Sequence, residues 1–158
     1  MTHRIDYHDD PAAPPATTVI PSANVVVANR AREILLIRRT DNRNWALPGG
    51  AMNLGESLVA AARRETAEET GVQVQITGLV GIYTDPRHVI LYPSNGEVRQ
   101  EFSVVFTARP IGGRPCPSDE ASEVRWVPPD QVAALTMDRS MWMRIAHYLA
   151  GNERPHLG

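Results

Sequence analysis

The chain of 158 residues has the length of one domain, and its 42% hydrophobic and 22% charged residues are typical of a globular protein. Its net charge of −2 does not predict the positively charged surface that binds duplex nucleic acid, so we expect no nucleic-acid partner. No apolar run reaches the length of a membrane span, and the single cysteine, Cys116, excludes an internal disulfide. We therefore expect a cytoplasmic protein without a membrane partner.

The first 17 residues are rich in Asp, Pro, Ala and Thr, and this composition predicts a flexible N-terminal arm over residues 1–17. We expect His3 and His8 in this arm to be solvated rather than to bind a ligand. Residues 18–151 are predicted to form the folded domain, followed by a short tail over residues 152–158. Because such an arm is able to pack across a second copy of the chain, a homodimer stays open.

Short aliphatic runs alternate along the chain with helical segments, which predicts a mixed sheet with helices on its faces. A polar turn between the first two runs indicates a hairpin, and Asn95-Gly96 indicates another turn of this kind. Gly71 and Gly151 are expected to end helices. The predicted strands are 23–28, 33–38, 72–76, 79–83, 89–92, 102–108 and 123–127, and the predicted helices are 56–70, 131–135 and 138–150.

The segment from Gly50 to Val72 joins a glycine-containing bend to a helix with several carboxylates, in the spacing G-x5-E-x7-R-E-x2-E-E-x-G-V. A helix advances about 100° per residue, so Glu65, Glu68 and Glu69 fall within roughly 100° of arc. Like charges this close destabilise a helix unless a cation lies between them. A hard divalent cation such as Mg²⁺ prefers oxygen ligands. The pattern therefore predicts a metal site.

Together with the preceding residues 45–49, this segment resembles the Nudix box of the Nudix hydrolase superfamily. Every charged position of the box is filled, and Thr66 stands where the family more often has an aliphatic residue. The resemblance implies a single-domain α/β fold, an α/β/α sandwich with a mixed β-sheet. It also implies hydrolysis of a nucleoside diphosphate linked to another moiety, by attack of water at phosphorus.

The resemblance further implies a metal site made by the carbonyl of Gly49 and by Glu65, Glu68 and Glu69. The expected ion is Mg²⁺, with Mn²⁺ as a possible substitute. Arg64 is expected to hold one of these carboxylates by a charge-assisted hydrogen bond, which keeps it oriented and ionised.

The general base stays open between Glu65 and a glutamate outside the box. Glu120 is the first outside candidate and Glu123 the second, because both lie in a polar segment just before the last predicted strand. Glu56 precedes Glu65 by about two and a half helical turns, so a regular helix would point it away from the other carboxylates. We therefore expect Glu56 to anchor the loop.

Substrate selection must come from outside the box. Arg38 and Arg39 end a predicted strand just before the metal loop, where a guanidinium can bind phosphate oxygens as a forked donor. Tyr83 and Arg87 lie at and after the end of another strand and are candidates for contacting the second half of a substrate. A core position fits Tyr83 equally well.

We expect a Mg²⁺-dependent pyrophosphohydrolase for a small nucleotide, either a nucleoside triphosphate or an ADP-ribose-like nucleotide sugar. The alternative is a pyrophosphohydrolase for dinucleoside polyphosphates or RNA 5′ ends. A third hypothesis is a non-catalytic Nudix module that binds nucleotide for regulation. Loss of a box glutamate would favour this last hypothesis, and the sequence retains all of them.

Overall fold

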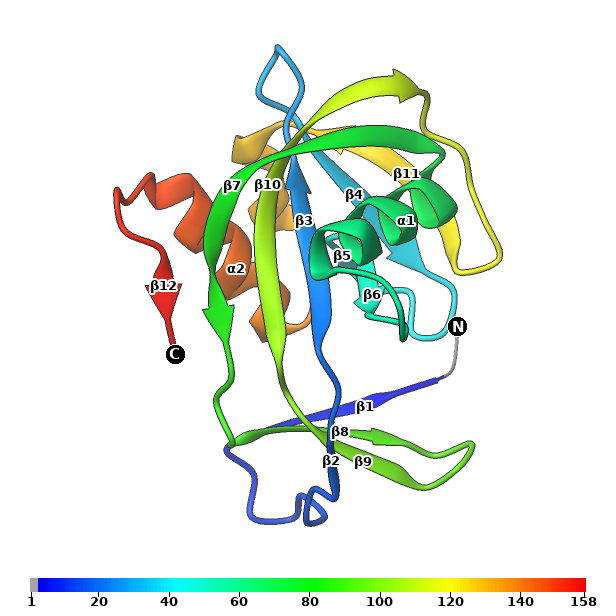
Figure 1. Ribbon diagram of the computed structural model, residues 1–158, viewed down its shortest axis with the longest axis vertical. Helices are drawn as coiled ribbons and strands as arrows, with labels where there is room; N and C mark the ends of the chain where they lie inside the picture. Colours follow the sequence, from blue (N-terminus) through cyan, green and yellow to red (C-terminus); the bar gives the residue numbers. More distant parts are fainter. Residues whose placement is uncertain (1–2) are drawn as a thin grey trace.

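The computed structural model describes residues 3–158 (Figure 1). Its strands form a five-stranded sheet ordered β12-β7-β10-β3-β6, a three-stranded sheet ordered β11-β4-β5, and a four-stranded sheet ordered β1-β8-β9-β2. The elements are, in chain order, β1 (Ile5–His8), β2 (Thr18–Val19), β3 (Ser22–Val27), β4 (Ile34–Arg39), β5 (Trp45–Ala46), β6 (Gly49–Ala51), α1 (Leu58–Thr70), β7 (Val72–Tyr83), β8 (His88–Tyr92), β9 (Glu97–Gln100), β10 (Ser103–Gly113), β11 (Ala121–Val127), the 3-10 helix η1 (Pro129–Ala134), α2 (Arg139–Ala150) and β12 (His156–Leu157).

The central layer of strands is buried on both faces, with α1 on one side and α2 on the other (Figure 1). Side chains alternate across a strand, so Val25 and Val27 of β3 pack with Ala62 of α1. Val26, between them, packs in the core that contains Ile145 of α2. The sheet is mixed because β10 pairs parallel with β3 and antiparallel with β7. The predicted α/β/α sandwich is confirmed.

The helix that carries the box carboxylates ends where the sequence predicts. The Ser57 side chain caps it by accepting a hydrogen bond from the backbone N–H of Ala60 at 3.0 Å. It stops at Gly71, whose φ of 77° is a left-handed conformation that a residue without a Cβ adopts at little cost. Thr66 and Thr70 face the core together with the small residues Ala61 and Ala62, whereas Val59 is exposed.

The structure corrects the predicted pairing of the first two long strands. They do not form a hairpin: β3 pairs with β10 and β6, and β4 pairs with β11 and β5. Only an isolated bridge from Ala28 to Ile34 joins them. The reason is that β3, with valines facing both layers, lies inside the sheet and has a partner on each edge.

The Asn95-Gly96 turn does connect two antiparallel strands, β8 and β9. Strand β9 was not predicted because three of its four residues are polar, namely Glu97, Arg99 and Gln100. The two strands predicted over 72–76 and 79–83 form one continuous strand, β7, with irregular register against β10.

The prediction of a flexible arm over residues 1–17 is wrong for residues 5–8, which form β1 and pair antiparallel with β8. The first two residues of that predicted arm lie outside the described residues. The predicted tail likewise contains β12, which pairs with β7. Polar contacts hold β1 in place, including the hydrogen bonds of Asp6 with His88 and of His8 with Asp138, and composition alone does not reveal such contacts.

Within residues 3–158, no helix is both long enough and apolar enough to cross a membrane.

Candidate active site

Three carboxylates converge at the surface formed by α1 and the loop before β11. Glu65 and Glu69 lie one helical turn apart on α1, and Glu120 comes from the loop. One oxygen from each lies within 4.8 Å of the others, and we call this group the carboxylate cluster. Glu68 is not in the cluster, because its side chain is 59% exposed and contacts Arg64 at 3.3 Å. The structure therefore brings together two of the three predicted box carboxylates and the predicted outside glutamate.

Hydrogen bonds fix the loop that carries Glu120 against the end of α1. The Ser118 hydroxyl donates to the backbone carbonyl of Glu69 at 3.1 Å, and the Cys116 N–H donates to the carbonyl of Thr70 at 2.8 Å. The Thr40 N–H, just after β4, donates to the carbonyl of Glu120 at 3.2 Å. The bonds to Glu69 and Thr70 use carbonyls that the helix end leaves unsatisfied, and together the three bonds place Glu120 next to a helix far from it in sequence.

The glycine bend packs directly on the two helix carboxylates. The Gly49 N–H donates to the carboxylate of Glu69 at 2.8 Å. A Cβ at position 50 would lie 2.5 Å from the carboxyl carbon of Glu65, so only glycine fits Gly50 without a shift. The metal-binding role that the resemblance gives to the Gly49 carbonyl stays a prediction.

Arg64 links the helix to the loop in front of it. Its guanidinium donates to both oxygens of Glu56, at 3.0 and 2.7 Å, and to Glu65 at 2.8 Å. The expectation that Glu56 points away assumed a regular helix, but α1 begins at Leu58 and Glu56 lies in the turn before it. Glu56 also accepts from the Asn53 N–H at 2.8 Å. These bonds lower the pKa of Glu56 to about 2, and Glu56 anchors the loop as expected.

Burial makes the cluster electrostatically unfavourable without a cation. The side chain of Glu69 is 2% exposed, and this burial raises its pKa to about 8, with the charges of Glu65 and Glu120 adding to the effect. The hydrogen bond from Gly49 acts in the opposite direction. Burial also raises the pKa of Glu65, with contributions from Glu68 and Glu120. A hard divalent cation binds carboxylate oxygens and would offset the repulsion between these buried charges.

A pocket of about 80 Å³, which we call the Glu69 pocket, lies beside the cluster. Of the predicted substrate residues, Arg39 lines it, and Asp41 holds the Arg39 guanidinium through bonds of 2.9 and 2.7 Å. Sequence reasoning missed other lining side chains that suit a nucleotide: Arg4, Tyr92, Arg99, Phe102 and Arg144. The Arg99 guanidinium lies 4.5 Å from the centre of the Tyr92 ring. In the sequence, the aromatic Tyr92 just before the Asn95-Gly96 turn was the one feature that pointed to these lining residues.

The other predicted substrate residues lie elsewhere. Arg38 is at the surface and pairs with Glu123 at 2.9 Å. Tyr83 and Arg87 line a separate cavity of about 610 Å³. Tyr83 is buried, as its alternative core assignment expects, and Arg87 is exposed and pairs with Asp85 at 2.9 Å. The structure does not bring these three to the Glu69 pocket.

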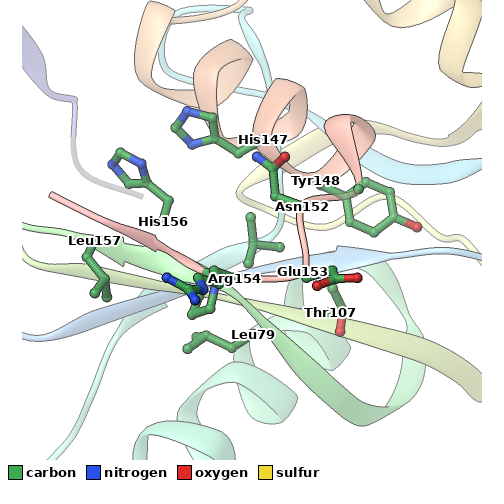
Figure 2. Close-up of a pocket in the computed structure, with 12 residues that line it drawn as sticks. Leu79, Thr107, His147, Tyr148, Asn152, Glu153, Arg154, His156 and Leu157 are labelled. Atoms are coloured by element: carbon green, nitrogen blue, oxygen red, sulfur yellow. The ribbon is translucent and has the colours of Figure 1, made fainter.

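A larger cavity, of about 720 Å³, lies between the end of α2 and strands β7 and β12 (Figure 2). Figure 2 shows His147, His156, Arg154 and Glu153 around it. Its lining includes no member of the carboxylate cluster, so volume alone does not identify the site of phosphate chemistry here.

The raised pKa of Glu69 predicts how the metal-free protein responds to pH. The folded protein binds a proton at Glu69 with a pKa of about 8, whereas the ordinary pKa is 4.5. This difference stabilises the folded state fully below pH 4.5, and the stabilisation is lost as the pH rises through 8. We therefore expect Glu69→Gln to raise the melting temperature in chelator relative to wild type by an amount that grows between about pH 5 and about pH 8.5. Thermal unfolding followed by circular dichroism measures this difference.

The matched control is Glu68→Gln, which removes the same charge from an exposed position of the same helix. Its difference from wild type should change little over this range. Equal pH dependence of the two variants would show that burial does not govern the Glu69 carboxyl.

Comparison with known proteins agrees with this geometry. A family model described as NUDIX domain matches residues 18–148. A MutT-like protein of Streptomyces ambofaciens is 35% identical over 122 residues, which are 77% of this chain and 71% of that protein. A putative 8-oxo-dGTP diphosphatase of Bacillus subtilis is 32% identical over 111 residues, which are 70% of this chain and 67% of that protein.

Among solved structures, a Nudix hydrolase from Nitrosomonas europaea matches with a TM-score of 0.68 and 22% identity, over 87% of this chain and 93% of that one. This likeness supports the fold. The chain belongs to the Nudix hydrolase family, whose members cleave pyrophosphate bonds of nucleotides and typically depend on a divalent metal.

Proposed function

We propose that the protein is a Mg²⁺-dependent pyrophosphohydrolase whose substrate is a nucleoside triphosphate. The observation that carries this proposal is the carboxylate cluster, which adjoins a pocket lined by arginines and aromatic rings. The name of the Bacillus subtilis relative, a putative 8-oxo-dGTP diphosphatase, favours a triphosphate. An ADP-ribose-like nucleotide sugar is the second candidate substrate.

Glu65 and Glu69 would hold the cation, with the Gly49 carbonyl as a further proposed ligand, and Glu120 would face the attacking water. When bound, Mg²⁺ neutralises charge on the phosphate oxygens and lowers the pKa of water. The chain's own groups do the positioning: the Gly49 N–H orients Glu69, and Arg64 orients Glu65. Preorganised groups of this kind need no rearrangement during the reaction.

We assign the general base to Glu120 rather than to Glu65. A base must accept a proton from the attacking water, and Glu65, which Arg64 holds at 2.8 Å, would already be occupied as a metal ligand. Glu120 reaches the same cluster from a separate loop, opposite the helix.

The phosphate chain and part of the nucleoside would enter the Glu69 pocket, whose volume of about 80 Å³ is too small to enclose a whole nucleoside. Tyr92 and Phe102 offer ring surfaces for a base, and Arg39, Arg4 and Arg99 offer donors for phosphate oxygens. This arrangement would keep the phosphate chain next to the carboxylate cluster, because Glu69 belongs to both.

A substrate panel with Mg²⁺ tests the proposal. We expect the highest kcat/KM for a nucleoside triphosphate, with the products identified by mass as a nucleoside monophosphate and pyrophosphate. The other substrates in the panel are ADP-ribose, a dinucleoside polyphosphate and a 5′-triphosphorylated RNA. A higher kcat/KM for one of these would replace the substrate assignment, and binding without turnover of any of them would identify a regulatory module.

Substitution of Glu120 tests its role as the base. We expect Glu120→Gln to lower kcat by about 10²–10⁴-fold, the usual contribution of a general base, with a smaller change in KM. Asp119→Asn, at the exposed neighbouring position of the loop, is the matched control and should keep the wild-type rate. A near-normal kcat for Glu120→Gln, together with a large loss for Glu65→Gln, would move the base to Glu65.

Substitution of Arg64 tests the support of the metal ligands. A lysine keeps the charge but cannot form the fork that binds Glu56 and Glu65 together, so Arg64→Lys should lower activity by roughly 10–100-fold and raise the Mg²⁺ concentration that gives half-maximal rate. Arg63→Lys, at the adjacent exposed position, controls for helix propensity and charge. Equal activity of the two variants would exclude a positioning role for Arg64.

A further inference from the structure

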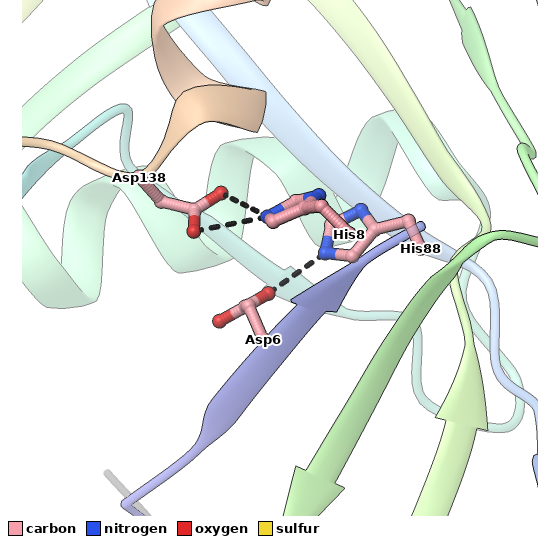
Figure 3. Close-up of side chains that lie close together, drawn as sticks. All are labelled: Asp6, His8, His88 and Asp138. Carbon is pink, nitrogen blue, oxygen red and sulfur yellow. Dashed lines mark hydrogen bonds and ion pairs between the residues drawn. The ribbon is translucent and has the colours of Figure 1, made fainter. Parts of the chain in front are cut away.

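A second group of possible metal ligands lies away from the carboxylate cluster. Asp6 and His8 of β1, His88 of β8 and Asp138 at the start of α2 each offer one ligand atom within 4.8 Å of the others. Figure 3 shows the four side chains pointing toward one another from three different elements. We call them the histidine–aspartate group. Nothing in the proposed hydrolysis uses them.

We propose that the histidine–aspartate group binds a Zn²⁺ ion that fastens the N-terminal strand to the rest of the domain. Two imidazole nitrogens and two carboxylate oxygens suit zinc rather than magnesium, which prefers oxygen ligands only. Bonds of about 2.0–2.2 Å in a tetrahedral site place neighbouring ligand atoms about 3.3–3.6 Å apart. The four side chains therefore need to approach by little more than roughly an ångström.

Two pairs of ligand atoms are hydrogen-bonded to each other and lie slightly closer than a tetrahedral metal site requires, so metal binding would move them apart by a few tenths of an ångström. The Nε2 atom of His88 lies 2.8 Å from a carboxylate oxygen of Asp6. The Nε2 atom of His8 lies 3.1 Å from each oxygen of Asp138, and the two imidazole rings lie 4.2 Å apart. The same nitrogen, Nε2, of both histidines therefore faces the centre of the group.

The other ring nitrogen of His88 faces a carboxylate, at a distance longer than that of an ordinary hydrogen bond. Its Nδ1 atom lies 3.4 Å from the carboxylate of Glu101, which in turn pairs with Arg144 at 3.5 Å. A carboxylate on the second ring nitrogen fixes the tautomer and strengthens the imidazole as a ligand. His88 and Glu101 have side chains that are 8% and 6% exposed, so their positions are set by the packing around them.

The two aspartates have other partners but keep room for a metal. Arg4 donates to both oxygens of Asp6, and Ser140 donates to Asp138, which caps α2. A carboxylate offers about four acceptor positions, so these bonds leave acceptor positions over. The Asp138 side chain is 27% exposed, and His8 and His88 line a cavity of about 610 Å³, which gives an ion a route from solvent.

Zn²⁺ binding would also affect the Glu69 pocket, because Glu101 and Arg144 line both that pocket and the cavity beside His88. An ion that fixes His88 would also fix Glu101. The site would thus stabilise β1 and one wall of the substrate pocket together, without taking part in hydrolysis.

Titration of the full-length protein with Zn²⁺, in excess Mg²⁺ to occupy the carboxylate cluster, tests the proposal. We expect one tightly bound Zn²⁺ by calorimetry, a higher melting temperature, and the intense visible absorption of tetrahedral Co²⁺ when Co²⁺ replaces Zn²⁺. Asp138→Asn keeps a good helix cap but removes a ligand charge, and it should weaken Zn²⁺ binding, as should His8→Gln. Glu101→Gln should weaken binding by roughly 10–100-fold, as loss of a supporting partner does.

Three control variants distinguish this site from others. His3→Gln changes an exposed histidine near the same terminus, His156→Gln breaks the other close pair of histidine rings, and Glu65→Gln removes a ligand of the carboxylate cluster. All three should bind Zn²⁺ as the wild type does. Loss of binding in any of them, or wild-type binding in both His8→Gln and Asp138→Asn, would overturn the proposal, as would the absence of a tetrahedral Co²⁺ spectrum. If His8→Gln does not fold, Asp138→Asn alone decides.

Discussion

The burial of the Glu69 carboxylate is the constraint on which the active site depends. This group is 2% exposed and lies beside two other carboxylates, an arrangement that raises its pKa to about 8. The fold tolerates it because the Gly49 N–H bonds it and because α1 is held by caps at both ends. A cation would convert this repulsion into attraction, so the stability that is given up locally is recovered on metal binding.

That constraint explains the local details of the bend and the helix. Any side chain at Gly50 would collide with Glu65, and a longer first turn of α1 would carry Glu56 out of reach of Arg64. Small residues, Ala61 and Ala62, face the sheet, which lets the helix lie close to β3 and β6. The carboxylate cluster limits which residues fit on one face of this short segment, and packing against the sheet limits which residues fit on the other face.

The sequence predicted this segment well because its information is local. The end of the helix at Gly71 was predicted from its left-handed cap, and its start was predicted at residue 56, two residues before Leu58. Helical spacing predicted Glu65 and Glu69, and also Glu68, which lies outside the cluster. Strand pairing was harder, since β3 and β4 read as a hairpin although they lie in different sheets. Glu120 was the first candidate outside the box, and it lies in the carboxylate cluster, while its catalytic role stays a prediction. The hydrogen bonds of Ser118 and Thr40 that place it appear only in three dimensions.

The largest error, the N-terminal arm, also has a physical meaning. Composition predicts disorder when too little apolar surface is available, but β1 is held by a backbone ladder and by hydrogen bonds of Asp6 and His8. This strand belongs to the sheet β1-β8-β9-β2, which lies at one end of the molecule in Figure 1. The sheet supplies Tyr92 and Arg99 to the Glu69 pocket, and Arg4, just before β1, lines it as well. The motif thus determines which bond is cleaved. The groups proposed to select the molecule lie in and beside a sheet that carries no motif, and for this reason the chemistry was easier to predict than the substrate.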